Sequence, residues 1–260
     1  MLYALKKGIL YGPVNSRRLG KSLGVNLMPS EYKLCSFNCI YCHFGWTNKL
    51  TLDMSKFAKD MPSMDVVVKA VEQAAQSDMD FNYITFSGNG EPTLYPHFPG
   101  LVAKIKRIRD RLRPSVKLAL LSNSTGLDYE QIRAVIPEFD VAMFKLDAGN
   151  EQKFTLINRP ASGINFLDIV KHLAQLENIY IQTIFIGGNP TNDTKEDLKD
   201  YFEKIRLIKP KGVHIYSIDR PVPDTHIILI PPARLEEIAQ QGEKETGILF
   251  KAFYPASIPG

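Results

Sequence analysis

Short apolar runs alternate with amphipathic runs along most of the chain. Apolar runs of about four to eight residues are typical of strands in a parallel sheet, and apolar residues spaced three or four apart are typical of the helices that cover it. The pattern predicts six strands: Ser22–Met28, Asn82–Ser87, Lys117–Ser122, Asp140–Leu146, Ile179–Ile186 and Gly212–Ile218. It also predicts helices over Ser63–Ser77, His97–Arg111, Tyr129–Val135, Ile164–Leu176, Lys195–Ile208 and Pro232–Gln241, and strand-like segments over Ile227–Ile230 and Ile248–Phe253.

Strands that alternate with helices predict an α/β fold, here a partial (β/α)6 barrel with right-handed crossovers. We expect the barrel to occupy residues 1–223 and a C-terminal extension, residues 224–260, to pack on it. Tyr11–Gly20 contains Gly12-Pro13 and is expected to be a turn-rich segment before the first strand. In β/α barrels the active site lies at the carboxyl ends of the strands, so the loops after the predicted strands are where chemistry is expected.

Composition adds few constraints. The chain has 260 residues, is 44% apolar and 23% charged, and carries a formal charge of +4, which permits an anionic partner without requiring one. Residues 1–8 lack the apolar core of a signal peptide, and no apolar run approaches the ~20 residues of a membrane span. The sequence therefore predicts a cytoplasmic protein that does not associate with membranes and whose thiols stay reduced.

All three cysteines lie in Leu34–Gly45, as Cys35, Cys39 and Cys42, and His43 follows them. Such clustering argues against simple packing of small hydrophobic side chains. A disulfide would use two of the three cysteines and leave the third unpaired. A structural zinc site could use the three thiolates and His43, although zinc ligands usually come in two separated pairs. Cys39 to His43 also matches the Cys-x-x-Cys-His signature of covalent haem attachment, which ignores Cys35.

A further possibility is that the three thiolates bind three irons of a [4Fe–4S] cluster, which usually takes four cysteines. The fourth iron would then be open to a small molecule. The spacing Cys-x3-Cys-x-aromatic-Cys, with Tyr41 at the aromatic position, resembles the signature of the radical S-adenosylmethionine (SAM) enzymes. This resemblance implies a barrel of the radical SAM type, in which Cys35, Cys39 and Cys42 hold the cluster and SAM chelates the open iron.

Other segments resemble the wyosine-synthetase-like iron–sulfur oxidoreductases of this superfamily: Tyr11–Gly24, Ser87–Pro92, Phe144–Asp147, Asn158–Pro160 and Tyr216–Pro221. The resemblance extends roughly from Tyr11 to Pro223. True wyosine synthases carry more cysteines for a second cluster. With three cysteines, this chain is similar to a single-cluster member.

The resemblance also implies SAM contacts at the strand ends. Gly88, Asn89, Gly90 and Glu91 resemble the Gly-Gly-Glu motif that meets the amino end of SAM, where glycine lets the backbone come close and acceptors meet the ammonium. The other predicted cofactor-binding residues are Tyr41, the aromatic residue of the cysteine motif, Ser122 and Asn123, which correspond to ribose-binding positions, Lys145, near a carboxylate or substrate anion, and Gln182, along the barrel wall.

The implied reaction is reductive cleavage of SAM to a 5′-deoxyadenosyl radical, which abstracts hydrogen from a substrate. The electron would come from a low-potential donor such as flavodoxin or ferredoxin. The substrate is open: an RNA nucleoside, a peptide, a partner enzyme or a small metabolite. Candidate substrate-side residues are Arg17, Arg18, Arg159, Asp219 and Arg220. The alternative is a non-catalytic zinc or iron–sulfur binding protein.

Overall fold

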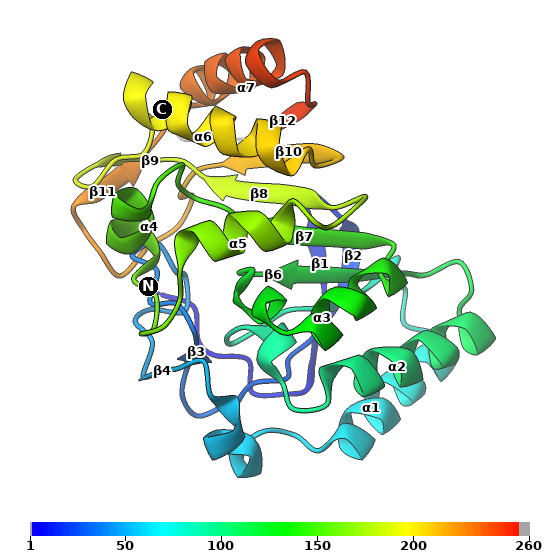
Figure 1. Ribbon diagram of the computed structural model, residues 1–260. Coiled ribbons are helices and arrows are strands. Elements are labelled where there is room, and N and C mark those ends of the chain that lie inside the picture. The colour runs from blue at the N-terminus through cyan, green and yellow to red at the C-terminus, as the bar shows by residue number, and fades with distance from the viewer. Residues whose placement is uncertain (1, 255–260) are drawn as a thin grey trace. The chain divides into compact units, whose positions relative to one another are not determined.

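A computed structural model describes residues 2–254 (Figure 1). These residues fall into two compact units. Unit 2 contains Ala4–Ser36 and Thr47–Met143, and unit 1 contains residues 2–3, Phe37–Trp46 and the described chain from Phe144 onward. The cysteine loop is therefore divided, because Cys35 belongs to unit 2 whereas Cys39 and Cys42 belong to unit 1.

The strands of unit 2 follow the order β1-β2-β5-β6-β7. Their bounds are Leu10–Ser16 (β1), Gly20–Val25 (β2), Tyr83–Phe86 (β5), Lys117–Ser122 (β6) and Val141–Lys145 (β7). β1 is antiparallel to β2, whereas β2, β5 and β6 are parallel, with Tyr83 opposite both Ser22 and Lys117. Ile84, Thr85 and Phe86 are all buried, as expected for a parallel strand that is covered on both faces.

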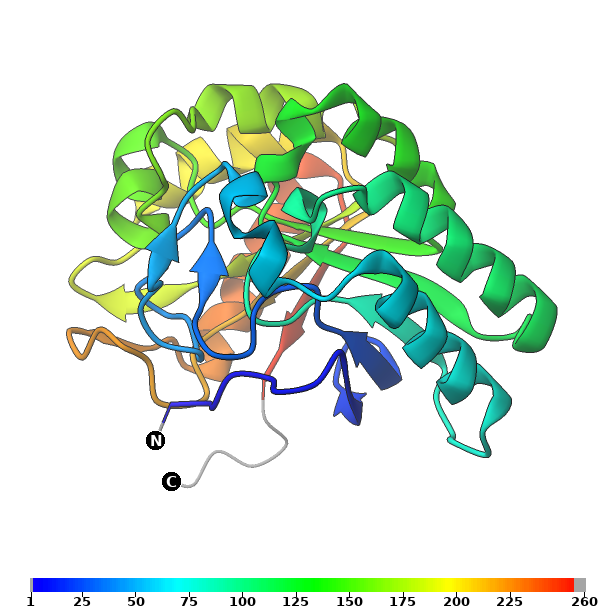
Figure 2. The same ribbon diagram turned by 90° about the horizontal axis from the view of Figure 1, so that it is seen from below.

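The helices of unit 2 present one apolar stripe each to this sheet. In α1 (Met64–Gln76) the buried residues include Val67, Val71 and Ala74, spaced four and three apart on one face. The other helical segments are α2 (Phe98–Leu112), α3 (Glu130–Val135) and the 3₁₀ segments η1 (Met54–Asp60), η2 (Pro92–Leu94), η3 (Thr125–Asp128) and η4 (Ile136–Glu138). Figure 2 shows α1 and α2 side by side.

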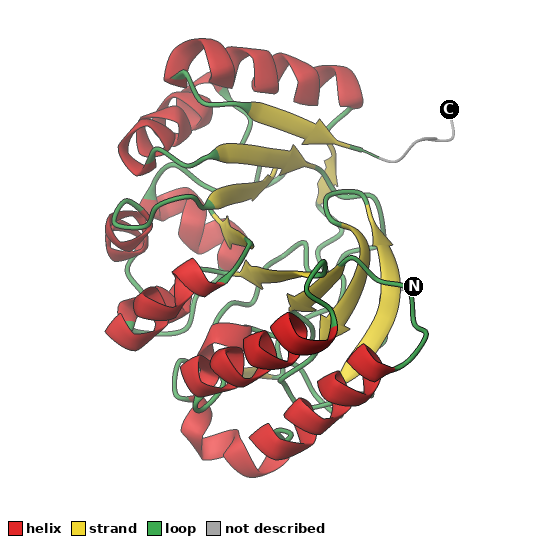
Figure 3. Cartoon of the chain, turned by 90° about the vertical axis from the view of Figure 1, so that its right-hand side faces the viewer, coloured by secondary structure: helices red, strands yellow, loops and turns green. Residues whose placement is uncertain are grey.

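The strands of unit 1 follow the order β7-β8-β10-β12, with the last two residues of β7 in this unit. Their bounds are Tyr180–Ile184 (β8), Gly212–Tyr216 (β10) and Phe250–Phe253 (β12), and a separate antiparallel pair is formed by β9 (Ile186–Gly188) and β11 (Ile227–Leu229). The helices are α4 (Glu151–Asn158), α5 (Phe166–Leu173), α6 (Lys195–Ile208) and α7 (Pro232–Thr246). Within each unit the helices lie on one side of the strands (Figure 3).

The six predicted strands are present: β6 has the predicted bounds, β2 begins two residues earlier and ends three residues earlier than predicted, and the other four are shorter. The predicted helices are present as well. Three expectations were wrong in detail. The segment expected as turns, Tyr11–Gly20, is mostly strand β1, a solvent-facing edge strand whose register shifts near Gly12 and so lacks a clean alternation. Helix α4 was not predicted, because it is short and weakly amphipathic. Helix α7 runs past Gly242, where a Cβ would lie 2.7 Å from the Phe250 ring, so this glycine permits close packing and does not end the helix.

The chain after residue 224 contributes β12, which pairs in parallel with β10. The proposed boundary at residue 223 stays a prediction. Among residues 2–254, no helix combines the length and the apolar composition that crossing a bilayer requires.

Candidate functional site

None of the three cysteines, all of which lie in the described part of the chain, forms a disulfide. Cys35 is the last residue of the two-residue strand β3 (Leu34–Cys35), which pairs with β4 (Lys49–Leu50) in unit 2, and is buried. Cys39 and Cys42 are half-buried in unit 1. Within the described part of the chain, no three His, Cys, Asp or Glu side chains are grouped as a metal site. The three cysteines lie within eight residues of one another in the sequence.

Two asparagine amides face two of these sulfurs, one in each unit. In unit 2, Asn123 Nδ2 lies 3.7 Å from Cys35 Sγ. In unit 1, Asn158 Nδ2 lies 3.6 Å from Cys39 Sγ. An amide N–H can only donate, so each sulfur is placed as an acceptor, which favours the thiolate form that binds metals.

The loop after β5 brings Gly90 onto the strand that carries Cys35. A Cβ at Gly90 would lie 1.8 Å from the carbonyl oxygen of Leu34, so only glycine fits there. Gly88 has φ +138, in the region open to glycine, and a Cβ there would lie 2.4 Å from Asn26 Oδ1. Both glycines of the predicted Gly-Asn-Gly-Glu motif are therefore required by close backbone approach.

The side chain of Asn89 is fully buried and bonded to the N-terminal segment of unit 2. Its Oδ1 accepts from the backbone N–H of Lys6 at 2.7 Å, and its Nδ2 donates to the carbonyl oxygens of Lys6 and Pro29 at 2.9 Å each. Asn89 therefore holds the loop in place. Its side chain is used within the protein, so the backbone of the loop is the part that can contact a ligand.

Glu91 follows β5 in unit 2 and forms hydrogen bonds with residues at the end of β6. Its carboxylate is 1% exposed and accepts four hydrogen bonds. Oε1 accepts from Thr93 N (3.1 Å), Thr93 Oγ1 (2.5 Å) and Ser122 Oγ (2.8 Å), and Oε2 accepts from Asn123 N (2.5 Å). Burial raises the pKa of Glu91, and these four donors offset that rise only in part. Glu91 thereby positions both Ser122 and Asn123.

Lys145 lies in a buried cluster of unit 1 beside Cys39. Its ammonium is 2.9 Å from Asp147 Oδ1 and donates to Tyr216 Oη at 2.8 Å. It also lies 4.6 Å from the centroid of the Tyr41 ring. Burial alone would lower the pKa of Lys145, but Asp147 and then Tyr216 raise it above the ordinary value. Lys145 is therefore a protonated, ion-paired lysine and a poor nucleophile.

Tyr41, at the aromatic position of the cysteine motif, belongs to the same cluster. Its hydroxyl donates to Asp147 Oδ2. Burial, and then the charges of Asp147 and Cys39, raise the pKa of Tyr41 well above that of a free tyrosine, so the phenol keeps its proton. Gln182, predicted on the barrel wall, is buried in β8 of this unit.

The candidate substrate-side residues divide between the units. Arg17 and Arg18 follow β1 in unit 2. In unit 1, Arg159 lies 3.4 Å from Asp224 and over the ring of Trp46, while Arg220 lies 3.7 Å from Asp219. The two arginines of unit 1 are half-exposed, and each lies beside an aspartate and over an aromatic ring, Trp46 for Arg159 and Tyr3 for Arg220.

Residues 32–214 match the family model of the radical SAM superfamily, and this stretch contains all three cysteines. This chain belongs to the radical SAM superfamily. It is therefore an enzyme of the class that cleaves SAM with the help of an iron–sulfur cluster, and its predicted partial (β/α) barrel of the radical SAM type is confirmed.

Two curated relatives and one solved structure illustrate the membership. A UPF0026 protein of Helicobacter pylori is 32% identical over 220 residues, which cover 82% of this chain and 67% of that protein. A protein named GTPase Obg from Brachyspira hyodysenteriae is also 32% identical over 220 residues, but this chain spans only 31% of its length. The structure of TYW1 with a lysine-pyruvate adduct shares the fold at 14% identity and a TM-score of 0.57, covering 87% of this chain and 75% of that one.

The residues of this radical SAM chain fit an iron–sulfur cluster. None of the three sulfurs is in a disulfide, and two of them face amide donors. Hydrogen bonds to cluster sulfurs are a regular feature of such sites. Sequence reasoning did not assign a role to Asn158. The signal was the Asn158–Pro160 motif, but its contact with Cys39 depends on how α4 packs against the cysteine loop.

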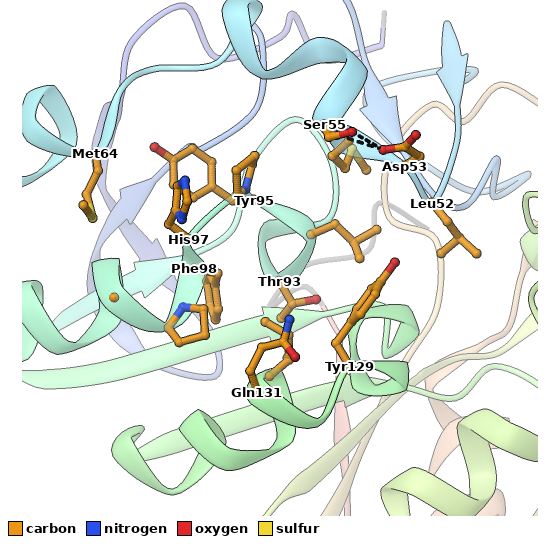
Figure 4. A pocket seen from close by; sticks show the side chains of 16 residues that line it. Leu52, Asp53, Ser55, Met64, Thr93, Tyr95, His97, Phe98, Tyr129 and Gln131 are labelled. Carbon is orange, nitrogen blue, oxygen red and sulfur yellow. Dashed lines mark hydrogen bonds between the residues drawn. The ribbon is translucent and has the colours of Figure 1, made fainter.

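A pocket of about 760 Å³ lies in unit 2 near the start of α2. Figure 4 shows Tyr95, His97 and Phe98 along one part of its wall, with Tyr129 and Leu52 along another. None of the predicted site residues lines it. Its lining includes Thr93, so it adjoins the Glu91 segment without containing it.

Proposed function

We propose that Cys35, Cys39 and Cys42 supply three thiolate ligands to a [4Fe–4S] cluster whose remaining iron takes SAM. The observation that supports this most directly is the presence of three cysteines at radical SAM spacing, none of them in a disulfide, inside the matched region. When bound, the cluster passes one electron to SAM, which yields methionine and a 5′-deoxyadenosyl radical that takes a hydrogen atom from a substrate.

The proposed SAM-binding residues include several that lie at or just after the ends of the strands. We propose that the backbone of Gly88, Asn89 and Gly90 meets the amino end of SAM. This is supported by the side chains of Asn89 and Glu91, which already bond within unit 2 and hold that backbone in place. The remaining proposed cofactor-binding residues are Tyr41, Glu91, Ser122, Asn123, Lys145 and Gln182. Lys145 acts there as a fixed positive charge, because Asp147 keeps it protonated.

The electron donor is proposed to be flavodoxin, ferredoxin or another low-potential carrier, because cluster potentials reach down to about −700 mV and SAM cleavage needs the low end. The candidate substrates are an RNA nucleoside, a peptide, a partner enzyme and a small metabolite. Deuterated candidates distinguish them, because only the true substrate passes deuterium into 5′-deoxyadenosine.

Anaerobic reconstitution with iron and sulfide tests the cluster. The wild-type protein is expected to bind three to four irons, to absorb broadly in the visible, to bleach with dithionite and to release 5′-deoxyadenosine from SAM. Cys35→Ala, Cys39→Ala and Cys42→Ala should each abolish that release. Stoichiometric zinc without 5′-deoxyadenosine would support the non-catalytic alternative instead.

His43→Ala is the matched control, because His43 is adjacent to Cys42 and would be the fourth ligand of a Cys3His zinc site. A cluster with an open iron does not need this imidazole. Iron content and 5′-deoxyadenosine formation that survive His43→Ala therefore support the proposal, and loss of metal in this variant contradicts it.

A further inference from the structure

Asn158 holds the cysteine loop by its backbone. It is the last residue of α4 and is 1% exposed. Its carbonyl oxygen accepts from the N–H of Asn38 at 3.0 Å, and the carbonyl oxygen of Ile157 accepts from the N–H of Ile40 at 3.0 Å. Both donors flank Cys39, so the end of α4 fixes the segment that presents this sulfur.

The side chain of Asn158 connects Cys39 to the buried cluster of unit 1. Its Nδ2 lies 2.8 Å from Asp147 Oδ2, 3.1 Å from Tyr41 Oη and 3.6 Å from Cys39 Sγ. The carboxylate fixes the amide orientation, because only the NH₂ group can face it. The amide has two hydrogens, and the two oxygens are adjacent, so one hydrogen is shared between them and the other faces the sulfur.

This orientation leaves a buried polar atom without a partner. Within residues 2–254, Asn158 Oδ1 has no hydrogen-bond partner, although most buried carbonyl oxygens have one. The Asn158 side chain thus leaves its carbonyl oxygen without a donor, while its NH₂ group faces the oxygens of Asp147 and Tyr41 and the sulfur of Cys39. Asp147 does not depend on Asn158 for its position, since its Oδ1 also accepts from Ile184 N at 2.9 Å and faces Lys145.

We infer that Asn158 is a positioning residue whose Nδ2–H···Sγ bond to Cys39 raises the reduction potential of the cluster. The inference rests on the proposed function, because it requires Cys39 to be a cluster ligand. On reduction the cluster gains one electron, and its thiolate sulfurs become more negative. A hydrogen bond to such a sulfur therefore stabilises the reduced form more than the oxidised form.

Removing the donor should shift the one-electron equilibrium toward the oxidised cluster by about tenfold, which corresponds to a potential lower by about 59 mV. Asn158→Leu has a similar size and removes both hydrogens. Asn158→Ser is smaller and too short to replace the amide, so it serves as the second variant if the leucine variant fails to fold.

Asn192→Leu is the matched control. Asn192 is also a buried asparagine of unit 1, and its Nδ2 donates to the carbonyl oxygens of Asp147 and Ile184 at 2.8 Å each, so it lies beside the same carboxylate without facing a sulfur. Asn192 Oδ1 also accepts from Ile186 N at 2.8 Å, so Asn192→Leu should lose at least as much thermal stability as the Asn158 variants. A change of potential confined to the Asn158 variants is then not explained by lost stability.

The test is a dithionite titration of the reconstituted proteins, followed by the electron paramagnetic resonance signal of the reduced cluster. We expect a lower potential in both Asn158 variants and an unchanged potential in Asn192→Leu. An unchanged potential in the Asn158 variants, or an equal shift in the control, overturns this inference alone. A wild-type protein that binds zinc and forms no cluster overturns both this inference and the proposed function.

Discussion

Glu91→Gln tests whether one buried carboxylate fixes the strand ends that carry the proposed SAM site. Glutamine keeps the size and shape of the side chain but replaces one acceptor oxygen with an NH₂ group. Oε1 accepts three hydrogen bonds, so the carbonyl oxygen of the glutamine should remain there. The NH₂ group then faces the backbone N–H of Asn123, which donates to Oε2 at 2.5 Å in the wild-type protein. Two donors would oppose each other in a buried site.

The magnitude follows from that opposition. A buried donor left without an acceptor costs about 1–3 kcal/mol. We therefore expect Glu91→Gln to lower the free energy of unfolding by about 2 kcal/mol, which for a chain of this size lowers Tm by about 4–8 °C. Urea unfolding followed by circular dichroism measures the first quantity, and a thermal scan at the same pH measures the second.

Glu138→Gln is the control for this prediction. Glu138 pairs with Lys106 at the surface of unit 2, where the two side chains are 43% and 38% exposed. Such a pair contributes little, so this variant should stay within about 0.5 kcal/mol of the wild type. If Glu91→Gln is no less stable than Glu138→Gln, the carboxylate does not fix the strand ends and the role assigned to it is wrong.

Three further predictions concern stability, pH and fluorescence. Lys145→Met leaves Asp147 without its buried ion-pair partner at 2.9 Å, so it should lower the free energy of unfolding by about 3–5 kcal/mol in urea. Burial would raise the pKa of Asp140, but a backbone N–H and an arginine lower it below 3.8, so its stabilising contribution is present above that pH and lost as the pH falls through the folded pKa. Asp140→Asn should therefore have a lower Tm than the wild type at pH 7, and the difference should close below about pH 3.8. Trp46 is the single tryptophan and lies four residues after Cys42, within roughly 14 Å along an extended chain, so its emission should fall when the cluster is loaded.

Each of these has a result that contradicts it. A Lys145→Met protein as stable as the wild type would mean that the ion pair contributes nothing to folding. A Tm difference for Asp140→Asn that is constant from pH 7 to pH 3 would exclude a depressed pKa as its cause. Tryptophan emission that is equal before and after iron incorporation would place the cluster away from the cysteine loop.

Much of the fold was predictable because, in most strands and helices, the apolar positions along the sequence are the ones that are buried. The run that became β5 is apolar on both faces, and the stripe on α1 repeats at helical spacing, so each could be recognised without its neighbours. Edge strand β1 could not, because it faces solvent and its register shifts at a glycine. Helix α4 was missed for a similar reason, since its eight residues carry a weak apolar stripe.

The candidate site residues could be proposed from the sequence, but their contacts could not. The cysteine spacing and the Gly88–Glu91 motif are local and could be read directly. That Glu91 accepts from Ser122 and Asn123 depends on two strands lying side by side, and that Asn158 faces Cys39 depends on contacts more than one hundred residues apart. Local sequence carries no signal for such contacts, so the sequence proposed candidate ligands but not the residues that contact them.

The central claim is that SAM binds directly to the iron that the three cysteines leave open. Electron–nuclear double resonance on the reduced wild-type protein tests it, with SAM labelled with ¹⁵N at its amino group. The account predicts a ¹⁵N hyperfine coupling between that nitrogen and the unpaired electron of the cluster, which is replaced by a ¹⁴N coupling with unlabelled SAM. A fully loaded cluster whose spectrum shows no ¹⁵N coupling and does not change when SAM is added would contradict it.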